Sequence, residues 1–154
     1  VLEADGKPIV DAATLGYTVG THRPGDLVSL MVLRDGRRLS MTLRAEAPPA
    51  TPARDERKLS GRNPLDGATV VNLSPAVAVE VGIDPFTGPG VLVTNVDRGL
   101  AMSIGLHPGD IIRAVNGRRI DSVGDLASAV SAPQRAWRIT IERNGQEITA
   151  VFQG

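Results

Sequence analysis

The sequence predicts a mainly β protein with short helices (α+β), built as a partly open β-barrel or sandwich that two or three short helices cap. Three observations point to this fold. Short β-favouring runs alternate with turns rich in Gly and Pro. Asn-Gly and Asp-Gly steps, the strongest short-range hairpin signals, recur between the runs. Only 3% of the 154 residues are aromatic, so the core has to be built from Val, Ile, Leu and Ala, which suits small β-rich modules.

An internal repeat organises the chain. Residues 1–19 (VLEADGKPIVDAATLGYTV) align with residues 112–130 (IRAVNGRRIDSVGDLASAV), and residues 30–43 align with 139–152 after a two-residue offset. Each copy contains a turn, a helix and a hairpin whose tip is Asp-Gly or Asn-Gly. Only the second copy has further β-favouring chain in front of it. We therefore expect residues 1–44 to be the C-terminal half of a first domain, cut inside a longer protein, and residues 64–154 to be a complete second domain.

Residues 45–63 separate the two copies. Pro48, Pro49 and Pro52 favour extended chain, and the charged residues that follow them favour contact with water. We expect a linker here, with a short ordered segment near residues 58–60.

The second copy predicts a regular series of elements: strands at 68–73, 91–96 and 110–115, helices at 76–81, 100–104 and 122–130, and a hairpin of 138–143 with 146–152. Ser74-Pro75 is a typical helix start, with a capping side chain followed by Pro at the first helical position. The helix at 122–130 carries Val123, Ala127 and Val130 along one stripe. We expect strand 68–73 at an exposed sheet edge beside this helix, where an extended peptide could add as a further strand.

The composition excludes several function classes. Seventeen basic and seventeen acidic residues balance, so no global field attracts nucleic acid or anionic lipid. The chain lacks Cys, and no apolar run approaches the roughly 18 residues needed to span a bilayer. His22 and His107 lie in polar turns beside Pro without a carboxylate at metal-ligand spacing. No Ser stands in a G-x-S-x-G elbow. We expect no catalytic residue, no metal site and no cofactor in this chain, with Asp110 stabilising a turn and Trp137 packing in the core.

Two motifs carry a family resemblance. Residues 105–112 (GLHPGDII), followed by Asn116-Gly117 and Leu126, resemble the bacterial PDZ signature. Residues 63–68 (NPLDGA), leading into residues 73–76 (LSPA), resemble the opening of the second PDZ domain of Deg/HtrA (Do/DegQ-type) serine proteases. Residues 2–43 are similar to the matching half of another PDZ domain. Residues 98–101 (RGLA) depart from the family pattern, because they lack its usual small polar residue.

The resemblance implies a function for the parent protein. In this family a chymotrypsin-like domain precedes the PDZ pair, so the parent is expected to be a periplasmic serine endopeptidase of protein quality control. The chain itself is then a non-catalytic peptide-binding, regulatory and assembly module, and its partners are C-terminal or extended segments of unfolded proteins and other subunits of the parent. Two alternatives remain: a purely structural subunit-assembly module, or the PDZ pair of another protease, such as an intramembrane metalloprotease, or of a secretion system.

The resemblance also places a peptide-binding site. It consists of a carboxylate loop, the edge strand and the groove helix: Leu65, Asp66, Gly67, Ala68, Thr69, Val70, Val123, Ala127 and Val130. Asp66 stands where the family loop has an apolar residue. A carboxylate within about 5 Å of a ligand's terminal carboxylate repels it by roughly 3 kcal/mol at an effective dielectric near 20. We therefore expect weak binding of C-terminal peptides, with the domain serving assembly or substrate relay.

Overall fold

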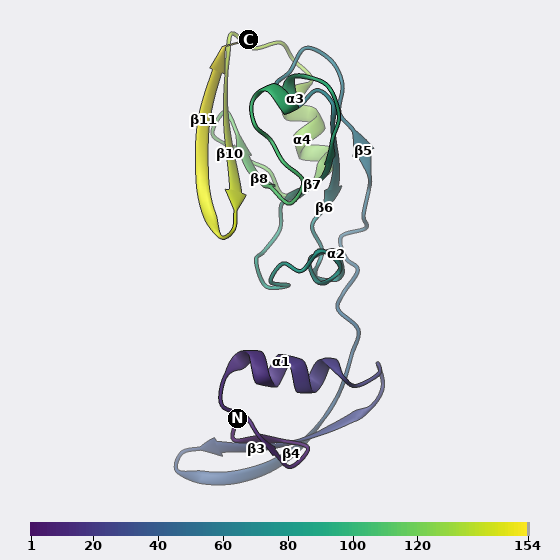
Figure 1. Ribbon diagram of the computed structural model, residues 1–154, viewed down its shortest axis with the longest axis vertical. Helices are drawn as coiled ribbons and strands as arrows, with labels where there is room; N and C mark the ends of the chain where they lie inside the picture. The colour runs from purple at the N-terminus through teal and green to yellow at the C-terminus, as the bar shows by residue number, and fades with distance from the viewer. Residues whose placement is uncertain (154) are drawn as a thin grey trace. The chain divides into compact units, whose positions relative to one another are not determined.

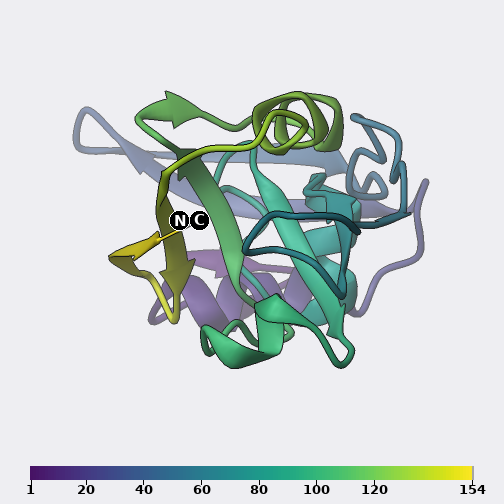
Figure 2. The same ribbon diagram turned by 90° about the horizontal axis from the view of Figure 1, so that it is seen from above.

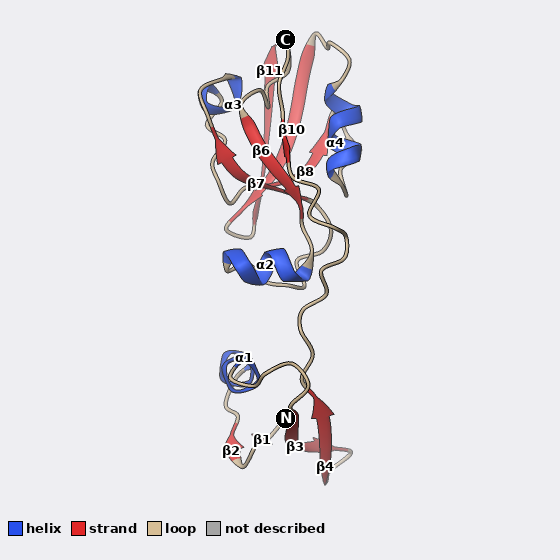
Figure 3. Cartoon of the chain, turned by 90° about the vertical axis from the view of Figure 1, so that its right-hand side faces the viewer, coloured by secondary structure: helices blue, strands red, loops and turns tan. Residues whose placement is uncertain are grey.

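The computed structural model describes residues 1–153 and forms two compact units, Val1–Ala47 and Pro48–Gly154. The described residues are mainly β, with four short helices and two open sheets (Figures 1 and 3). The predicted class is confirmed: short strands dominate, three helices accompany the larger sheet, and that sheet does not close into a barrel.

The first unit is a four-stranded antiparallel sheet with one helix. Its strand order is β2-β1-β3-β4. Val28, Leu30 and Ala4 form its small buried cluster. The elements are β1 (Glu3–Ala4), β2 (Lys7–Pro8), α1 (Ala12–Gly20), β3 (Leu27–Arg34) and β4 (Arg37–Arg44).

The second unit is built on a seven-stranded sheet. The strand order is β11-β10-β8-β7-β6-β5, and β9 pairs β8 beside this path. Its strands are β5 (Arg57–Lys58), β6 (Ala68–Asn72), β7 (Val91–Val96), β8 (Ile111–Val115), β9 (Arg118–Arg119), β10 (Ala136–Arg143) and β11 (Gln146–Gln153). Its helices are α2 (Pro75–Val81), α3 (Leu100–Ser103) and α4 (Val123–Val130), and Figure 2 views α4 nearly along its axis.

Two apolar clusters bury both faces of the strands β6, β7 and β8. Because successive side chains of a strand point to opposite faces, Val70 packs in the larger cluster with Val123 and Leu126 of α4, and its neighbour Val71 packs in the smaller one with Val77 of α2. The alternation explains why these strands read as nearly continuous apolar runs. The helices predicted at 76–81 and 122–130 therefore cover opposite faces of one sheet.

The two copies of the sequence repeat have equivalent strand pairings in the structure. The sheet β2-β1-β3-β4 of the first unit has the same pairings as β9-β8-β10-β11 of the second. Equivalent turns agree in detail: Asp5 Oδ1 accepts from the backbone N–H of Ser29 (2.9 Å), and Asn116 Oδ1 accepts from that of Arg138 (2.7 Å). Asp5 and Asn116 both have a φ near 50°, a conformation that Asn and Asp tolerate better than most residues. Both hairpins follow from the same turn chemistry.

The expectation that residues 68–73 form an exposed edge strand is wrong. β6 pairs β7 on one side and β5 on the other, with Arg57 opposite Val70 and Lys58 opposite Thr69. The backbone N–H of Asn72 extends this pairing to the carbonyl oxygen of Arg54 (2.8 Å). Four of the five β6 residues are buried, and buried backbone groups require hydrogen-bond partners. The chain's own residues 54–59 supply them.

Much of the predicted linker is therefore ordered. The first unit ends at Ala47, so the Pro-rich stretch lies in the second unit. The carbonyl oxygen of Pro49 accepts a hydrogen bond from the N–H of Ala76 (3.0 Å), and that of Ala53 accepts one from Asn72 Nδ2 (2.8 Å). The short ordered segment expected near residues 58–60 corresponds to β5 and Leu59, and its order comes from pairing with β6.

Candidate functional site

A tight loop, residues 65–68, begins the site. Gly67 has a φ of 91°, and a Cβ there would lie 3.1 Å from the carbonyl oxygen of Arg98. Only Gly combines this backbone conformation with so close an approach. The carbonyl oxygens of Asp66 and Gly67 accept hydrogen bonds from the N–H groups of Ala101 (3.0 Å) and Asp97 (2.9 Å). The loop is thus held in place by residues 97–101.

Asn72 connects β6, the helix α4 and the chain in front of β5. Its Oδ1 accepts from the N–H of Val123 (2.7 Å), one of the free donors in the first turn of α4. Its Nδ2 donates to the carbonyl oxygen of Ala53 (2.8 Å). Ser122 caps the same helix by accepting from the N–H of Asp125 (3.1 Å). Asn72 therefore fixes the distance between the strand and the helix that form the groove.

Leu59 fills the space between β6 and α4. Its side chain is 6% exposed and packs in the larger cluster with Leu65, Val123 and Leu126. Its N–H donates to the carbonyl oxygen of Ala68 (2.8 Å), and its own carbonyl oxygen accepts from the N–H of Gly67 (3.0 Å). An added peptide strand would place an apolar side chain in the groove in the same way. Here the side chain in that position, Leu59, belongs to the chain itself.

Two acidic residues, Asp66 in the loop and Asp97 beside it, contact the segment on either side of Leu59. Asp66 Oδ1 accepts from the N–H of Gly61 (3.1 Å). Lys58 Nζ lies 2.6 Å from Asp97 Oδ2, with both side chains about half exposed to solvent. The segment 57–61 is therefore attached by backbone pairing, one buried leucine and two polar contacts.

The predicted site residues divide into three groups. Leu65, Ala68, Val70 and Val123 are fully buried in one cluster, so none of them is accessible in this structure. Ala127 and Val130 are partly exposed and line a groove of about 320 Å³, whose other side is formed by residues 57–63. Gly67, Asp66 and Thr69 contact the segment 57–61 through the hydrogen bonds and pairing described above. The structure thus brings the predicted residues together around an occupied groove.

Sequence reasoning misses the groove's own occupant. It assigns Lys58, Leu59 and Gly61 to the linker and gives Asn72 no role. One signal is available: Leu59 is the single large apolar residue in the charged stretch 54–63 (RDERKLSGRN). A lone leucine in such a stretch indicates a burial site elsewhere in the fold, although it does not say which one.

The Lys58–Asp97 contact predicts how attachment of β5 depends on pH. The hydrogen bond from Lys58 is the main cause that holds the pKa of Asp97 below its ordinary value of 3.8, and the same bond raises the pKa of Lys58 above 10.5. The Asp97 contribution is complete above pH 3.8 and is lost as the pH falls through the lowered pKa. The Lys58 contribution is complete below pH 10.5 and is lost as the pH rises through the raised pKa.

We therefore expect the attachment of β5 to be constant between about pH 4 and pH 10 and to weaken on both sides. The measurement is the amide chemical shift of Leu59, followed by NMR as a function of pH. In the variant Lys58→Met, which keeps the aliphatic length of the side chain, the acid-side step should disappear. A Leu59 shift that moves through neutral pH would contradict the prediction.

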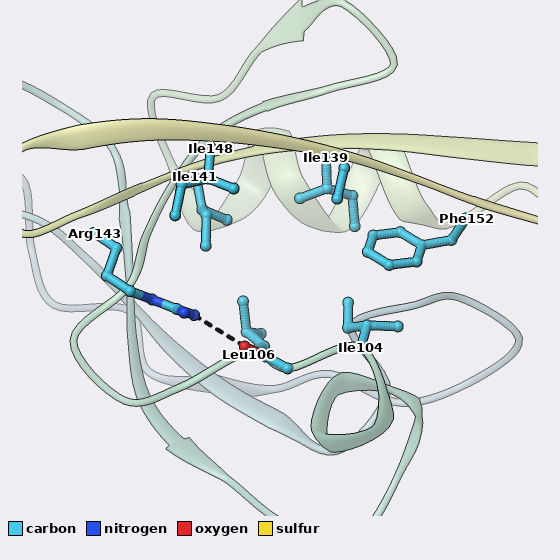
Figure 4. A pocket seen from close by; sticks show the side chains of 9 residues that line it. Ile104, Leu106, Ile139, Ile141, Arg143, Ile148 and Phe152 are labelled. Carbon is cyan, nitrogen blue, oxygen red and sulfur yellow. Dashed lines mark hydrogen bonds between the residues drawn. The ribbon is translucent and has the colours of Figure 1, made fainter.

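A second, apolar cavity lies between α3 and the hairpin of β10 and β11. Its volume is about 120 Å³, and its lining consists of Ile104, Gly105, Leu106, Ile139, Ile141, Arg143, Ile148, Ala150 and Phe152. In Figure 4 the isoleucines of β10 and β11 face Ile104 and Leu106. Its one charged residue, Arg143, donates to the carbonyl oxygen of Gly105 (2.9 Å) and to both carboxylate oxygens of Asp110 (2.6 and 2.7 Å). Its guanidinium is thus already paired, which makes this cavity a weaker candidate than the β6–α4 groove.

The remaining polar candidates have structural contacts. Asp110 is buried and accepts from the N–H of His107 (2.8 Å), so its carboxylate holds the turn in front of β8. His22 Nε2 lies 2.6 Å from Asp5 Oδ2 in the first unit. Residues 1–153 contain no cluster of three His, Cys, Asp or Glu side chains able to hold a metal ion. None of the helices within the same residues has the length and apolarity to cross a membrane.

Known proteins resemble the chain along nearly its whole length. The PDZ domain family matches residues 92–143. A probable periplasmic serine endoprotease, DegP-like, from Ectopseudomonas mendocina is 35% identical over 160 residues, which cover 99% of this chain and 33% of that protein. The periplasmic serine endoprotease DegP of Escherichia coli K12 is 28% identical over 155 residues, covering 99% of this chain and 29% of that protein.

A solved structure also resembles part of the chain in its fold. The HtrA-type protease AlgW with decapeptide matches 56% of this chain and 27% of that chain, with a TM-score of 0.50 and 28% sequence identity. This chain spans about a third of the length of the curated relatives. The loop, strand and helix described above lie in the second unit, together with the residues that match the PDZ family. Over nearly its whole length the chain is similar to the part of Deg/HtrA-type serine endoproteases that it covers, and residues 92–143 match the PDZ domain family.

Proposed function

We propose that the second unit is a non-catalytic, regulatory peptide-binding module of a Deg/HtrA-type serine endopeptidase, and that its site is the groove between β6 and α4. Extended segments of unfolded proteins are the proposed ligands. They add to β6 as a strand and place one apolar side chain against Val123 and Leu126. The curated relatives are named periplasmic serine endoproteases, which supports the periplasm as the location of the parent protein, and protein quality control is the process that we propose for it.

One observation carries this proposal: an extended segment already pairs antiparallel with β6 and buries Leu59 in the groove. Strand addition with an apolar side chain in a pocket is a general mode of peptide recognition. Because the chain's own segment occupies the position, an external ligand has to displace residues 57–61 before it binds. Peptide capture by this module is therefore conditional, and the tethered segment competes at a high effective concentration.

The domain organisation is part of the same proposal. Residues 1–44 correspond to the C-terminal half of a PDZ domain, residues 45–63 to the connecting segment and residues 64–154 to a second PDZ domain. The matching strand pairings of the two units support the correspondence. Residues 54–59 then belong structurally to the domain that follows them, as their hydrogen bonds with β6 indicate.

The proposal is tested by opening the groove in the full chain of residues 1–154. The probe is the acetylated and amidated peptide of residues 54–63, RDERKLSGRN. Leu59→Ala removes most of the buried side chain, so we expect this variant to bind the peptide at least tenfold more tightly than the unaltered chain, because the resident competitor is weakened. Titration by NMR should move the amide signals of β6 and α4.

Leu100→Ala is the matched control, since Leu100 is 50% exposed and lies outside the groove. It should leave peptide affinity unchanged. A folded Leu59→Ala variant that binds no peptide, or that binds it away from β6 and α4, would contradict the proposal. Concentration-dependent sedimentation without peptide binding would instead favour the subunit-assembly module, a function that the exposed Leu39, Met41 and Leu43 of β4 also fit.

A further inference from the structure

We infer that this groove selects an internal segment rather than a free C-terminus, that residues 57–61 are its resident ligand, and that Asp66 is the residue that sets this selection. The inference rests on the proposed function, because it concerns the ligand class of the same groove. It follows from where the chain goes after Leu59 and from the charges that it meets there.

The path of the segment after Leu59 indicates which class of ligand the groove accepts. Leu59 is the residue whose side chain enters the core, and its carbonyl oxygen takes the N–H of Gly67 (3.0 Å). The chain does not stop there but continues through Ser60 to Gly61. The N–H of Gly67, which would donate to one oxygen of a terminal carboxylate, therefore donates to the carbonyl oxygen of an ordinary peptide group, that of Leu59.

Asp66 contacts the chain beyond Leu59. Its Oδ1 accepts from the N–H of Gly61, a donor that exists only because the chain continues beyond Leu59 (3.1 Å). A ligand that ended at the position of Leu59 would bring a carboxylate toward this end of the groove and would lack the N–H group of Gly61. Two carboxylates within about 5 Å repel strongly enough, at an effective dielectric near 20, to lower affinity by roughly a hundredfold.

Lys58 supplies one of the positive charges along the groove. Lys58 Nζ contacts Asp97 Oδ2 (2.6 Å), but Lys58 belongs to the segment itself and leaves with it. A vacated groove therefore presents the carboxylates of Asp66 and Asp97 together. This charge pattern favours a ligand with a basic residue directly before its apolar anchor, and a free N–H group after the anchor, as in Lys58-Leu59-Ser60-Gly61.

The test uses three peptides of the same core: acetyl-RDERKLSGRN-amide, acetyl-RDERKL-amide and acetyl-RDERKL with a free carboxylate. The last two differ only at the terminal group, which is an N–H donor in one and an anion in the other. The groove is opened in the full chain by Lys58→Glu, which places an acid opposite Asp97 and leaves the core intact; Leu59→Ala is the second opened variant. Affinities are measured by calorimetry at low salt and again at about 0.15 M salt, where exposed charges are screened beyond roughly 8 Å.

We expect both amides to bind the opened chain, and the free acid to bind tenfold to a hundredfold more weakly. Adding Asp66→Asn removes the charge but keeps an oxygen acceptor for the following N–H, so the difference between acid and amide should shrink to less than about threefold. A free acid that binds as tightly as the amide, or a preference that Asp66→Asn leaves unchanged, would overturn the inference while the proposed function stands. If neither opened variant binds any of the peptides although both remain folded, the proposed function itself fails.

Discussion

Trp137→Ala is expected to cause a severe loss of stability in the second unit. Trp137 is 1% exposed and lies in the larger apolar cluster of that unit, at the start of β10 opposite Phe152. Removing a buried aromatic side chain costs about 3–5 kcal/mol through lost burial and the cavity that remains. That is a large part of the roughly 5–15 kcal/mol by which domains are stable. Urea unfolding followed by circular dichroism measures the effect without relying on the removed fluorophore.

Phe86→Ala supplies the matched control. Phe86 is also aromatic, but it is 90% exposed in the loop between α2 and β7. Its removal should change the free energy of unfolding by less than about 0.5 kcal/mol. Equal effects of the two substitutions would mean that the cluster around Trp137 is not the main core of this unit.

Gly99→Ala is expected to destabilise the site loop by about 1–3 kcal/mol. Gly99 has extended backbone, so the expected effect comes from space alone. A Cβ at this position would press against the carbonyl oxygen of Asp66 and would lie 3.0 Å from its carbonyl carbon. Because these are backbone atoms, relief requires movement of the loop 65–68 or of residues 97–101. The variant should therefore loosen β5 as well as lower the denaturation midpoint.

Gly124→Ala makes the same chemical change with the opposite expected sign. Gly124 lies inside α4, and the nearest heavy atom to an added Cβ is Ser122 Oγ at 3.7 Å, an ordinary contact. Ala is more favourable than Gly by roughly 0.5–1 kcal/mol in a helix interior, and we expect a smaller gain of the same sign at Gly124, the second residue of the helix. Unfolding midpoints of the two variants measure the contrast, and a Gly99→Ala chain as stable as the unaltered one would show that the loop can move at little cost.

Elements set by local chemistry could be predicted from the sequence. Ser74 accepts from the N–H of Val77 (3.2 Å), as its position before Pro75 indicated. Asn144-Gly145 and Asp35-Gly36 both have positive φ at two successive residues, as two-residue hairpin turns require. The repeat was also readable, because these turns recur at matching positions in both copies. Each of these features depends on residues within a few positions of one another.

The pairing of β6 could not be predicted in the same way. The alternation of its side chains identifies residues 68–72 as a strand, but the pattern does not state which segment lies beside it. Arg57 and Lys58 have side chains that are suited to water, and both are in fact exposed. Their backbone, rather than their side chains, covers β6. A strand whose contacts are made by backbone hydrogen bonds leaves almost no signal in the pattern of apolar residues along the sequence.

The role of Asp66 shows the same limit at a single residue. Its charge is readable from the sequence and predicts a conflict with a terminal carboxylate. Its partner, the N–H of Gly61, is not readable, because that contact depends on the path of the chain after Leu59. The peptide-binding role of the nine predicted residues stays a prediction, which the peptide titrations would test.

The short connection between Leu59 and the loop at Gly67 has a kinetic consequence. Loops of about ten residues close in roughly 10–100 ns, so residues 60–66 return Leu59 to its pocket long before most solutes arrive by diffusion. The capture rate then depends on how much of the time the segment is detached, and raising the concentration of protein leaves that fraction unchanged. A partner can bind only while the segment is briefly detached from the groove, or after a force on the chain before Arg54 has detached it.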